Sequence, residues 1–121
     1  QLLITLNERY GSESPATLFI LAQLYDREGD PESWIKCREA MLNLLALAPN
    51  NPSYTYQYIR MLLRHADGPG DLIDVEQYVS SLERMGTENL ILDAKARYLV
   101  AAGRPDEAAE LRRAADRRTT T

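Results

Sequence analysis

The sequence predicts an all-α fold in which antiparallel helices follow one another in pairs, and three observations support this. Apolar residues recur at helical spacing, as at Leu18, Leu21 and Tyr25, which share one face of a helix. Glycine precedes proline by two residues at Gly29-Asp30-Pro31 and again at Gly103-Arg104-Pro105. Because glycine readily ends a helix and proline readily begins one, each triplet indicates a turn between helices. No stretch of alternating β-branched residues indicates a strand.

Residues 1–13 are expected to form a short helix, the remnant of a preceding helix pair. The segment contains the apolar run Leu2-Leu3-Ile4 and is ended by Gly11. Because the sequence begins with Gln1 rather than Met, we expect a fragment of a longer protein. Any leader or membrane anchor would then lie outside it, so the sequence predicts no cellular location.

The first complete helix pair has clear start and stop signals. Ser14 supplies an N-cap hydroxyl, Pro15 takes the first helical position, and Gly29 ends the helix. The second helix begins after Asp30, its expected N-cap, and is stopped at Pro49. Four further helices are expected, over Tyr54–Leu63, Leu72–Met85, Leu92–Val100 and from Pro105 onward.

The turns recur at a period typical of helical repeat proteins. Gly29, Gly68 and Gly103 each end the first helix of a pair, at intervals of 39 and 35 residues. A period near 34 residues with two helices per unit predicts a solenoid. The positions that carry the pattern are Leu18, Leu21, Ala22, Tyr25, Gly29 and Pro49 in the first unit, Thr55, Tyr58, Ile59, Leu62, Val75, Val79 and Leu82 in the second, and Leu92, Lys95, Ala96, Leu99, Gly103 and Ala108 in the third.

At these positions the chain resembles the tetratricopeptide repeat family. The resemblance implies a right-handed superhelical solenoid of stacked antiparallel helix pairs. It divides the chain into an N-terminal helix (1–13), repeats at 14–50, 51–87 and 88–117, and a frayed tail (118–121). A helical repeat of another family is the alternative.

Each repeat departs from the family pattern. The second helix of the first repeat is about three residues too long, which leaves Trp34 or Cys37 for a position that requires a small side chain. We favour Cys37, because closely packed helices leave little room there. The second repeat has an insertion at its turn and Thr87 where the family has a closing proline.

Composition excludes several classes of function. The 121 residues carry a net charge of −4, which argues against a nucleic-acid partner. No apolar run approaches the ~20 residues that span a bilayer, so no membrane contact is expected. Four arginines crowd the C-terminus and are interpreted mainly as the cationic end of the last helix, with a partner-binding basic tail as the alternative. They are Arg112, Arg113, Arg117 and Arg118.

The chain offers little catalytic chemistry, and we expect neither an enzyme nor a bound cofactor or metal. Cys37 and His65 are a possible nucleophilic pair, but a structural role explains both. Zinc-ligand spacing is absent. The acidic cluster around Gly29 is interpreted as a solvated, helix-capping surface rather than a calcium loop. A lone cysteine makes no internal disulfide.

The resemblance implies that the first helices line a concave groove for a peptide or a helix. The residues that it places there are Phe19, Ile20, Gln23, Arg27, Ser53, Tyr56, Gln57, Arg60, Arg64, Leu90, Asp93, Ala94 and Arg97. The site residues proposed from this set are Phe19, Gln23, Arg27, Tyr56, Arg60, Arg64 and Arg97. Exposed aromatic rings and arginines would suit a partner with acidic and apolar residues. Alternatively, the rings pack between helices and the arginines are only solvated.

The predicted function is therefore a non-catalytic module for protein–protein interaction. The Lys and Asn arrangement by which some family members hold a C-terminal carboxylate is missing. Two alternatives stay open. One is a self-associating structural module that forms a homodimer through its apolar N-terminal end. The other is an accessory repeat domain of a larger enzyme or sensor protein.

Overall fold

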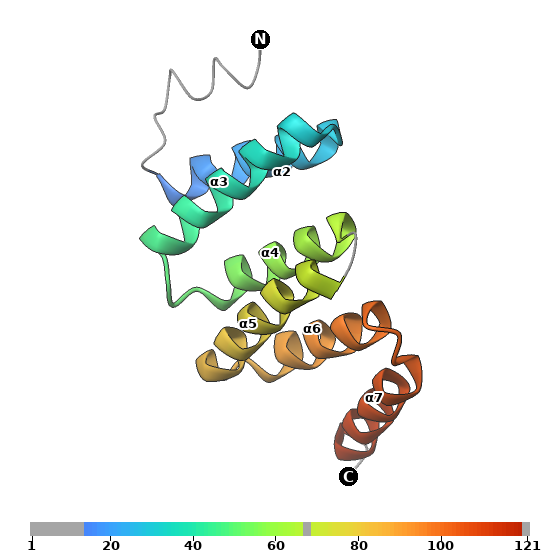
Figure 1. Cartoon of the computed structure of the whole chain (residues 1–121). Helices are drawn as coiled ribbons and strands as arrows, with labels where there is room; N and C mark the ends of the chain where they lie inside the picture. Colours follow the sequence, from blue (N-terminus) through green and yellow to red (C-terminus); the bar gives the residue numbers. More distant parts are fainter. Residues whose placement is uncertain (1–13, 67–68, 120–121) are drawn as a thin grey trace. The chain divides into compact units, whose positions relative to one another are not determined.

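The computed structural model describes residues 14–66 and 69–119, and over these residues the chain is helical without a strand (Figure 1). The helices are α2 (Pro15–Glu28), α3 (Pro31–Leu47), α4 (Pro52–His65), α5 (Pro69–Met85), α6 (Glu88–Ala101) and α7 (Pro105–Thr119). They confirm the predicted all-α class and the six helices expected after residue 13. The predicted helix within 1–13 and the glycine at position 68 lie outside the described residues.

The chain divides into two compact units, Gln1–Tyr54 and Thr55–Thr121. The division falls inside α4, four residues beyond the end of the first expected repeat at residue 50. The second unit therefore holds most of α4 together with α5, α6 and α7.

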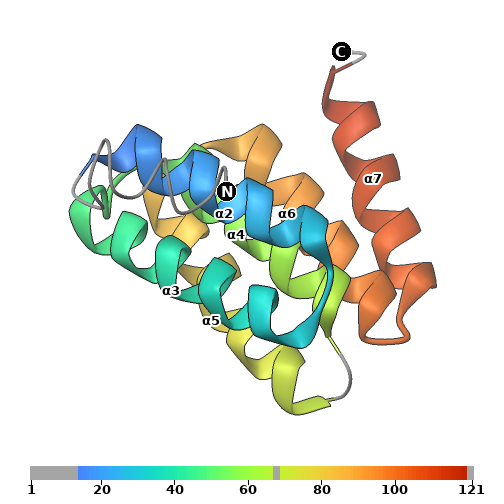
Figure 2. The same cartoon turned by 90° about the horizontal axis from the view of Figure 1, so that it is seen from above.

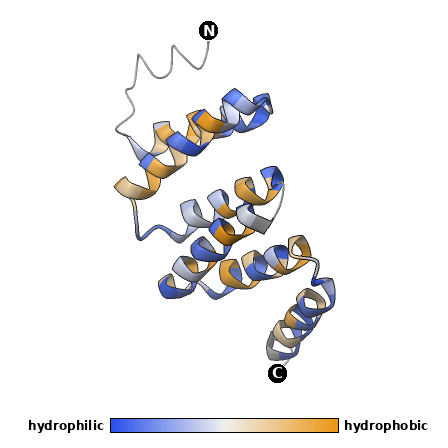
Figure 3. Ribbon diagram, in the orientation of Figure 1, coloured by the Kyte–Doolittle hydropathy of each residue, from blue (hydrophilic) through white to orange (hydrophobic). Residues whose placement is uncertain are grey.

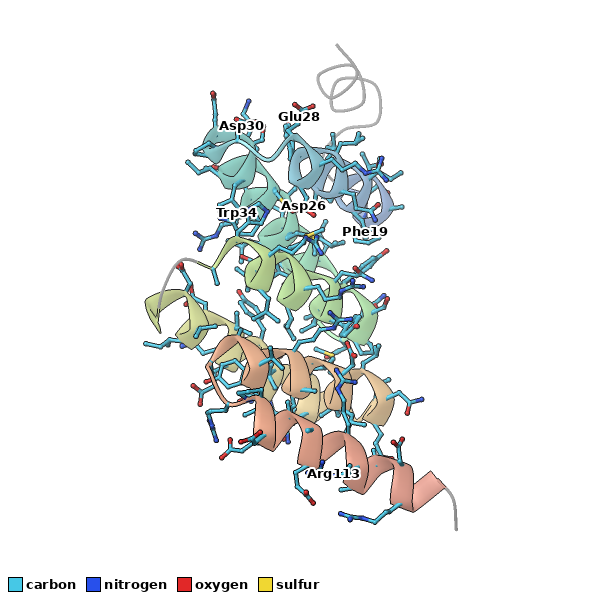
Figure 4. All side chains as sticks on the ribbon, turned by 90° about the vertical axis from the view of Figure 1, so that its right-hand side faces the viewer. Phe19, Asp26, Glu28, Asp30, Trp34 and Arg113 are labelled. Carbon is cyan, nitrogen blue, oxygen red and sulfur yellow. The ribbon has the colours of Figure 1, made fainter. Side chains whose placement is uncertain are left out.

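In the first unit, α2 and α3 form an antiparallel hairpin that runs side by side in both views (Figure 2). Gly29 ends α2 with φ 77°, a left-handed conformation that glycine adopts without strain. Asp30 caps α3 by accepting a hydrogen bond from the Ser33 amide at 3.0 Å. Its second oxygen accepts from the Ser33 hydroxyl at 2.6 Å. Asp30 and Glu28 stand at the turn of the hairpin (Figure 4).

The cap of α2 differs from the prediction. Ser14 occupies the N-cap position, and its carbonyl accepts the Leu18 amide at 3.0 Å. However, its hydroxyl makes no cap hydrogen bond. Both N-caps of the first unit precede a proline, but only the Asp30 side chain accepts a capping hydrogen bond.

The first unit buries one side of each helix. Leu18, Leu21 and Ala22 on α2 are at most 4% exposed. On α3, Cys37 is fully buried while Trp34 is partly exposed, which agrees with the preference for Cys37 at a position that requires a small side chain. Small residues at such positions let two helix backbones approach closely.

In the second unit, α4 contacts α5 through the rings of Tyr58 and Tyr78. The two ring centroids are 5.0 Å apart at 72°, an edge-to-face arrangement. Tyr58 is 1% exposed, as its repeat position predicted. Ile59 and Leu62 on α4 are also buried, as are Val75, Val79 and Leu82 on α5. Hydrophobic residues recur between hydrophilic ones along the helices (Figure 3).

The α6 helix packs against both α5 and α7. Ala96 and Ala94 on α6 are both fully buried. Burial of Ala96 was predicted. The prediction that Ala94 faces the groove was wrong, because a helix with neighbours on two sides buries two faces. Gly103 has φ 77°, and Arg104 donates its amide to Leu99 at 2.8 Å, so the predicted turn into α7 is confirmed.

Candidate functional site, an arginine-lined pocket

The second unit contains a pocket of about 520 Å³ that four arginines line, and we call it the arginine pocket. Its lining residues are Arg60, Leu63 and Arg64 from α4, Arg97, Val100 and Ala101 from α6, and Arg112 from α7. Cationic side chains therefore approach the pocket from three different helices. Among the lining residues that the structure describes, none carries a carboxylate.

Helical spacing explains why these side chains meet. Arg60 and Arg64 are one turn apart on α4, so they share a face. Arg97 and Ala101 have the same spacing on α6. Arg112 follows the buried Ala108 by four residues on α7, which places it on the side of that helix that faces the rest of the unit.

Asp93 on α6 joins three helices at the edge of the arginine pocket. Arg97, which lies one turn further along the same helix, donates from Nε to Asp93 Oδ2 at 2.6 Å. The Tyr56 hydroxyl on α4 donates to the same oxygen. Arg112 on α7 brings an Nη atom to 3.6 Å from Asp93 Oδ1. One carboxylate thus accepts a hydrogen bond from a phenol and pairs with two guanidinium groups. We call these four residues the Asp93 network.

The Asp93 network fixes the protonation of its members. Burial raises the pKa of Asp93, but hydrogen bonds from Tyr56 and Arg97 and the charge of Arg112 outweigh burial, so the pKa lies below its usual value. Burial and the hydrogen bond to Asp93 raise the pKa of Tyr56. At neutral pH, Asp93 is therefore an anion and Tyr56 a neutral hydrogen-bond donor.

Arg60 is held next to this network by a ring rather than by a carboxylate. Its guanidinium carbon lies 5.9 Å from the centroid of the Tyr56 ring, a cation–π distance. Tyr56 therefore contacts Asp93 with its hydroxyl and Arg60 with its ring. The ring links the α4 arginine to the α6 carboxylate, so the cations of the pocket are positioned together.

The structure brings four of the seven proposed site residues together in one unit. Arg60, Arg64 and Arg97 line the arginine pocket, and Tyr56 belongs to the Asp93 network. Asp93, which the repeat pattern also placed toward a groove, is the centre of that network. The other three proposed residues are on α2 in the first unit: Phe19, Gln23 and Arg27.

Neither aromatic residue of the proposed site is fully exposed, which agrees with the alternative that the rings pack between helices. Phe19 is half-buried, and its ring centroid is 5.4 Å from that of Tyr54 within the first unit. Tyr56 is also half-buried. Gln23 and Arg27 are exposed on α2 (Figure 4 labels Phe19 on the same helix).

Arg112 was not among the predicted site residues, because the C-terminal arginines were assigned as a group to the end of the last helix. Arg112 stands near the middle of α7 and lines the arginine pocket. By contrast, Arg113 and Arg117 both bind Glu110, at 2.9 and 3.2 Å. The spacing of four residues between Ala108 and Arg112 is the signal that separates Arg112 from its neighbours.

A smaller pocket of about 220 Å³ lies between α5 and α6, and its charged side chains pair across it. Lys95 binds Glu83 at 3.0 Å. The Tyr98 hydroxyl donates to Glu76 at 3.3 Å. These contacts bridge two packed helices, so the polar residues of this pocket are explained by helix packing and imply no ligand.

Other reactive side chains are placed by packing and helix ends. Cys37 is buried on α3, and His65 is the last residue of α4. Within residues 14–66 and 69–119, no three potential metal ligands are grouped. Over the same residues, no helix combines the length and apolar character needed to cross a membrane.

Comparison of the chain with protein-family models, with curated proteins and with solved structures found no match. The role of the arginine pocket and of the Asp93 network is therefore inferred from their residues alone.

Proposed function

We propose that the chain is a non-catalytic interaction module that binds an acidic segment of a partner protein in the arginine pocket. One observation carries the proposal: four arginines surround one pocket in a chain whose net charge is −4. Like charges repel, so a folded protein gathers cations around a cavity at a cost that an anionic ligand offsets.

Arginine suits a carboxylate ligand. Its planar guanidinium group donates two parallel hydrogen bonds to the two oxygens of a carboxylate. Arg97 donates from Nε to Asp93 and also hydrogen-bonds Tyr56, so its guanidinium group is already ordered at the pocket. Leu63, Val100 and Ala101 add apolar surface between the cations, so the partner segment carries apolar residues beside its acidic ones.

The Asp93 network supports binding by fixing the pocket before the ligand arrives. Arg97 and Arg112 are held by Asp93, and Arg60 lies against Tyr56. A side chain that is already ordered loses less conformational entropy on binding, and for a long arginine this saving is about 1 kcal/mol.

We also propose that the helices belong to a tetratricopeptide-like solenoid. The repeated glycine–proline turns and the buried Ala22, Ala96 and Ala108 support this assignment. In that arrangement α4 and α6 are the first helices of successive pairs, and first helices line the groove. Three of the four pocket arginines stand on these two helices.

A peptide library displayed on phage tests the proposed function. We expect the wild-type chain to enrich peptides that carry two or more acidic residues. The double variant Arg60→Glu/Arg64→Glu should lose them, because both changes reverse charge at the pocket wall. The matched control is Arg84→Glu/Arg113→Glu, which reverses two exposed arginines outside the pocket and should retain the peptides.

Two results would refute the proposal. One is enrichment of peptides without acidic residues. The other is equal binding by the wild type and by Arg60→Glu/Arg64→Glu, once circular dichroism shows that the variant is helical.

A further inference from the structure

Resting on the proposed function, we infer that Arg112 is the main ligand-binding residue of the arginine pocket, and that binding of the acidic ligand therefore stabilises α7 in its packed position. Two observations carry this inference. One is the availability of the Arg112 hydrogen-bond donors, and the other is the small number of side chains that α7 buries.

Three of the four pocket arginines already interact with other groups of the chain. Arg97 donates from Nε to Asp93 and also hydrogen-bonds Tyr56. The Arg60 guanidinium lies 5.9 Å from the centroid of the Tyr56 ring, and Arg64 has an interaction of its own within the chain. A ligand gains less from a group that already has a partner, because it exchanges one contact for another.

Arg112 differs from these three arginines. One of its Nη atoms is 3.6 Å from Asp93 Oδ1, which is an ion-pair distance but too long for a hydrogen bond. Among the described side chains Asp93 is its one charged partner, and the Arg112 side chain is 52% exposed. The charge of Asp93 thus keeps the guanidinium group at the pocket, while its N–H donors remain for a carboxylate, which accepts two of them in parallel.

The helix that carries Arg112 is also the one among α4 to α7 that buries the fewest of its described side chains. Over residues 105–117 only Ala108 is buried, whereas α4 buries five side chains. A segment with few buried apolar contacts opens at a lower free energy than the rest of a fold. The position of α7 therefore depends more on additional contacts than the positions of the other pocket helices do.

A ligand bound by Arg112 supplies such a contact. It joins α7 to α4 and α6, because residues of all three helices line the pocket. A ligand that binds only when α7 is packed in place stabilises the packed state by the factor 1 + [L]/Kd. Because this linkage is reciprocal, a change that loosens α7 lowers the affinity for the ligand.

A fluorescent pool of short peptides tests the role of Arg112. Two central positions are glutamate, and the flanking positions are randomised among uncharged residues. In fluorescence anisotropy we expect Arg112→Gln to bind the pool at least about tenfold more weakly than the wild type, because it loses charge-assisted hydrogen bonds. The matched control is Arg113→Gln on the same helix, where the arginine pairs with Glu110, and it should bind like the wild type. Arg112→Lys keeps the charge without the paired donors and should bind with intermediate affinity.

Hydrogen exchange tests the coupling between the ligand and α7. Exchange of the amides of residues 109–117 is measured by NMR without the pool and with the pool at about 100 times its dissociation constant. In the wild type we expect these amides to exchange at least about tenfold more slowly with the pool, within the limit of about a hundredfold that mass action sets. In Arg112→Gln, at the same multiple of its own dissociation constant, the change should be less than about twofold.

The outcomes separate this inference from the proposed function. Equal affinity of Arg112→Gln and the wild type, or unchanged exchange of the α7 amides on binding, would overturn the inference. The acidic-peptide function would still stand in that case if Arg60→Glu/Arg64→Glu loses the pool. A wild-type chain that does not bind the pool would contradict both. Weaker binding by Arg112→Gln together with slower exchange of α7 in the wild type supports both.

Discussion

Asp93 is the residue at which Tyr56, Arg97 and Arg112 converge. Its repeat position predicted that it faces a groove, but its partners were not predictable. Tyr56 is 37 residues away along the chain, and Arg112 stands on a different helix. Such contacts depend on the packing of whole helices, whereas sequence periodicity describes one helix at a time.

Replacing Asp93 tests the Asp93 network through pH. The folded-state pKa of Asp93 is lowered, so its ionised form stabilises the fold above the unfolded pKa of about 3.9, and this contribution is lost as the pH falls through the folded-state value. We expect Asp93→Asn to lower the free energy of unfolding at pH 6. The gap to the wild type should close as the pH falls below about 4.

Urea denaturation of both proteins at several pH values between 6 and 3 measures this gap. Asparagine has nearly the shape of a protonated aspartic acid, so packing contributes little to the difference. A gap that keeps its size from pH 6 to pH 3 would show that the charge of Asp93 does not stabilise the second unit.

Small buried residues were the most predictable residues of the core. Ala22, Ala96 and Cys37 are fully buried where the repeat pattern required small side chains. Ala94 was misassigned because the repeat pattern describes only one packed face of α6, and α6 has a neighbour on each side.

Enlarging a buried alanine tests the packing of α6. Ala96→Leu adds three carbon atoms to a fully buried position and should cost roughly 1–3 kcal/mol in the free energy of unfolding. The exposed Ala109→Leu on α7 should change it by less than about 0.5 kcal/mol. Chemical denaturation measures both, and equal effects of the two substitutions would contradict the assigned packing of Ala96.

At the scale of the element, helix ends were predicted more accurately than helix contacts. Proline at the first turn and glycine at the end are local signals, and they located α2, α3 and α7. Whether the side chain at the N-cap accepts its hydrogen bond depends on side-chain geometry. Ser14 and Asp30 therefore differ, although both residue types favour the N-cap.

These two caps give a matched pair of substitutions. Asp30→Ala removes the acceptor of the Ser33 amide and should lower the melting temperature. Ser14→Ala removes a hydroxyl without a cap hydrogen bond and should leave the melting temperature close to that of the wild type. Thermal denaturation followed by circular dichroism compares them. A larger drop for Ser14→Ala would reverse the assignment of the two caps.

At the scale of the whole molecule, positive charges gather at one pocket although the chain as a whole is negatively charged. The chain carries a net charge of −4, yet four of its arginines line one pocket. The resemblance to the repeat family implied that Arg60, Arg64 and Arg97 line one groove. The pocket itself was not predictable, because α7 completes it through Arg112, and the position of α7 beside α6 depends on tertiary packing.

The most direct test of the account follows the arginine side chains themselves. Nitrogen–proton NMR spectra of the Arg Nε–H groups are recorded while an acidic peptide from the displayed library is added. We predict that the signals of Arg60, Arg64, Arg97 and Arg112 shift together and reach saturation as peptide is added, and that those of Arg84 and Arg113 stay in place. Shifts at Arg84 and Arg113 with none at the pocket arginines would contradict the assignment of the arginine pocket as the binding site.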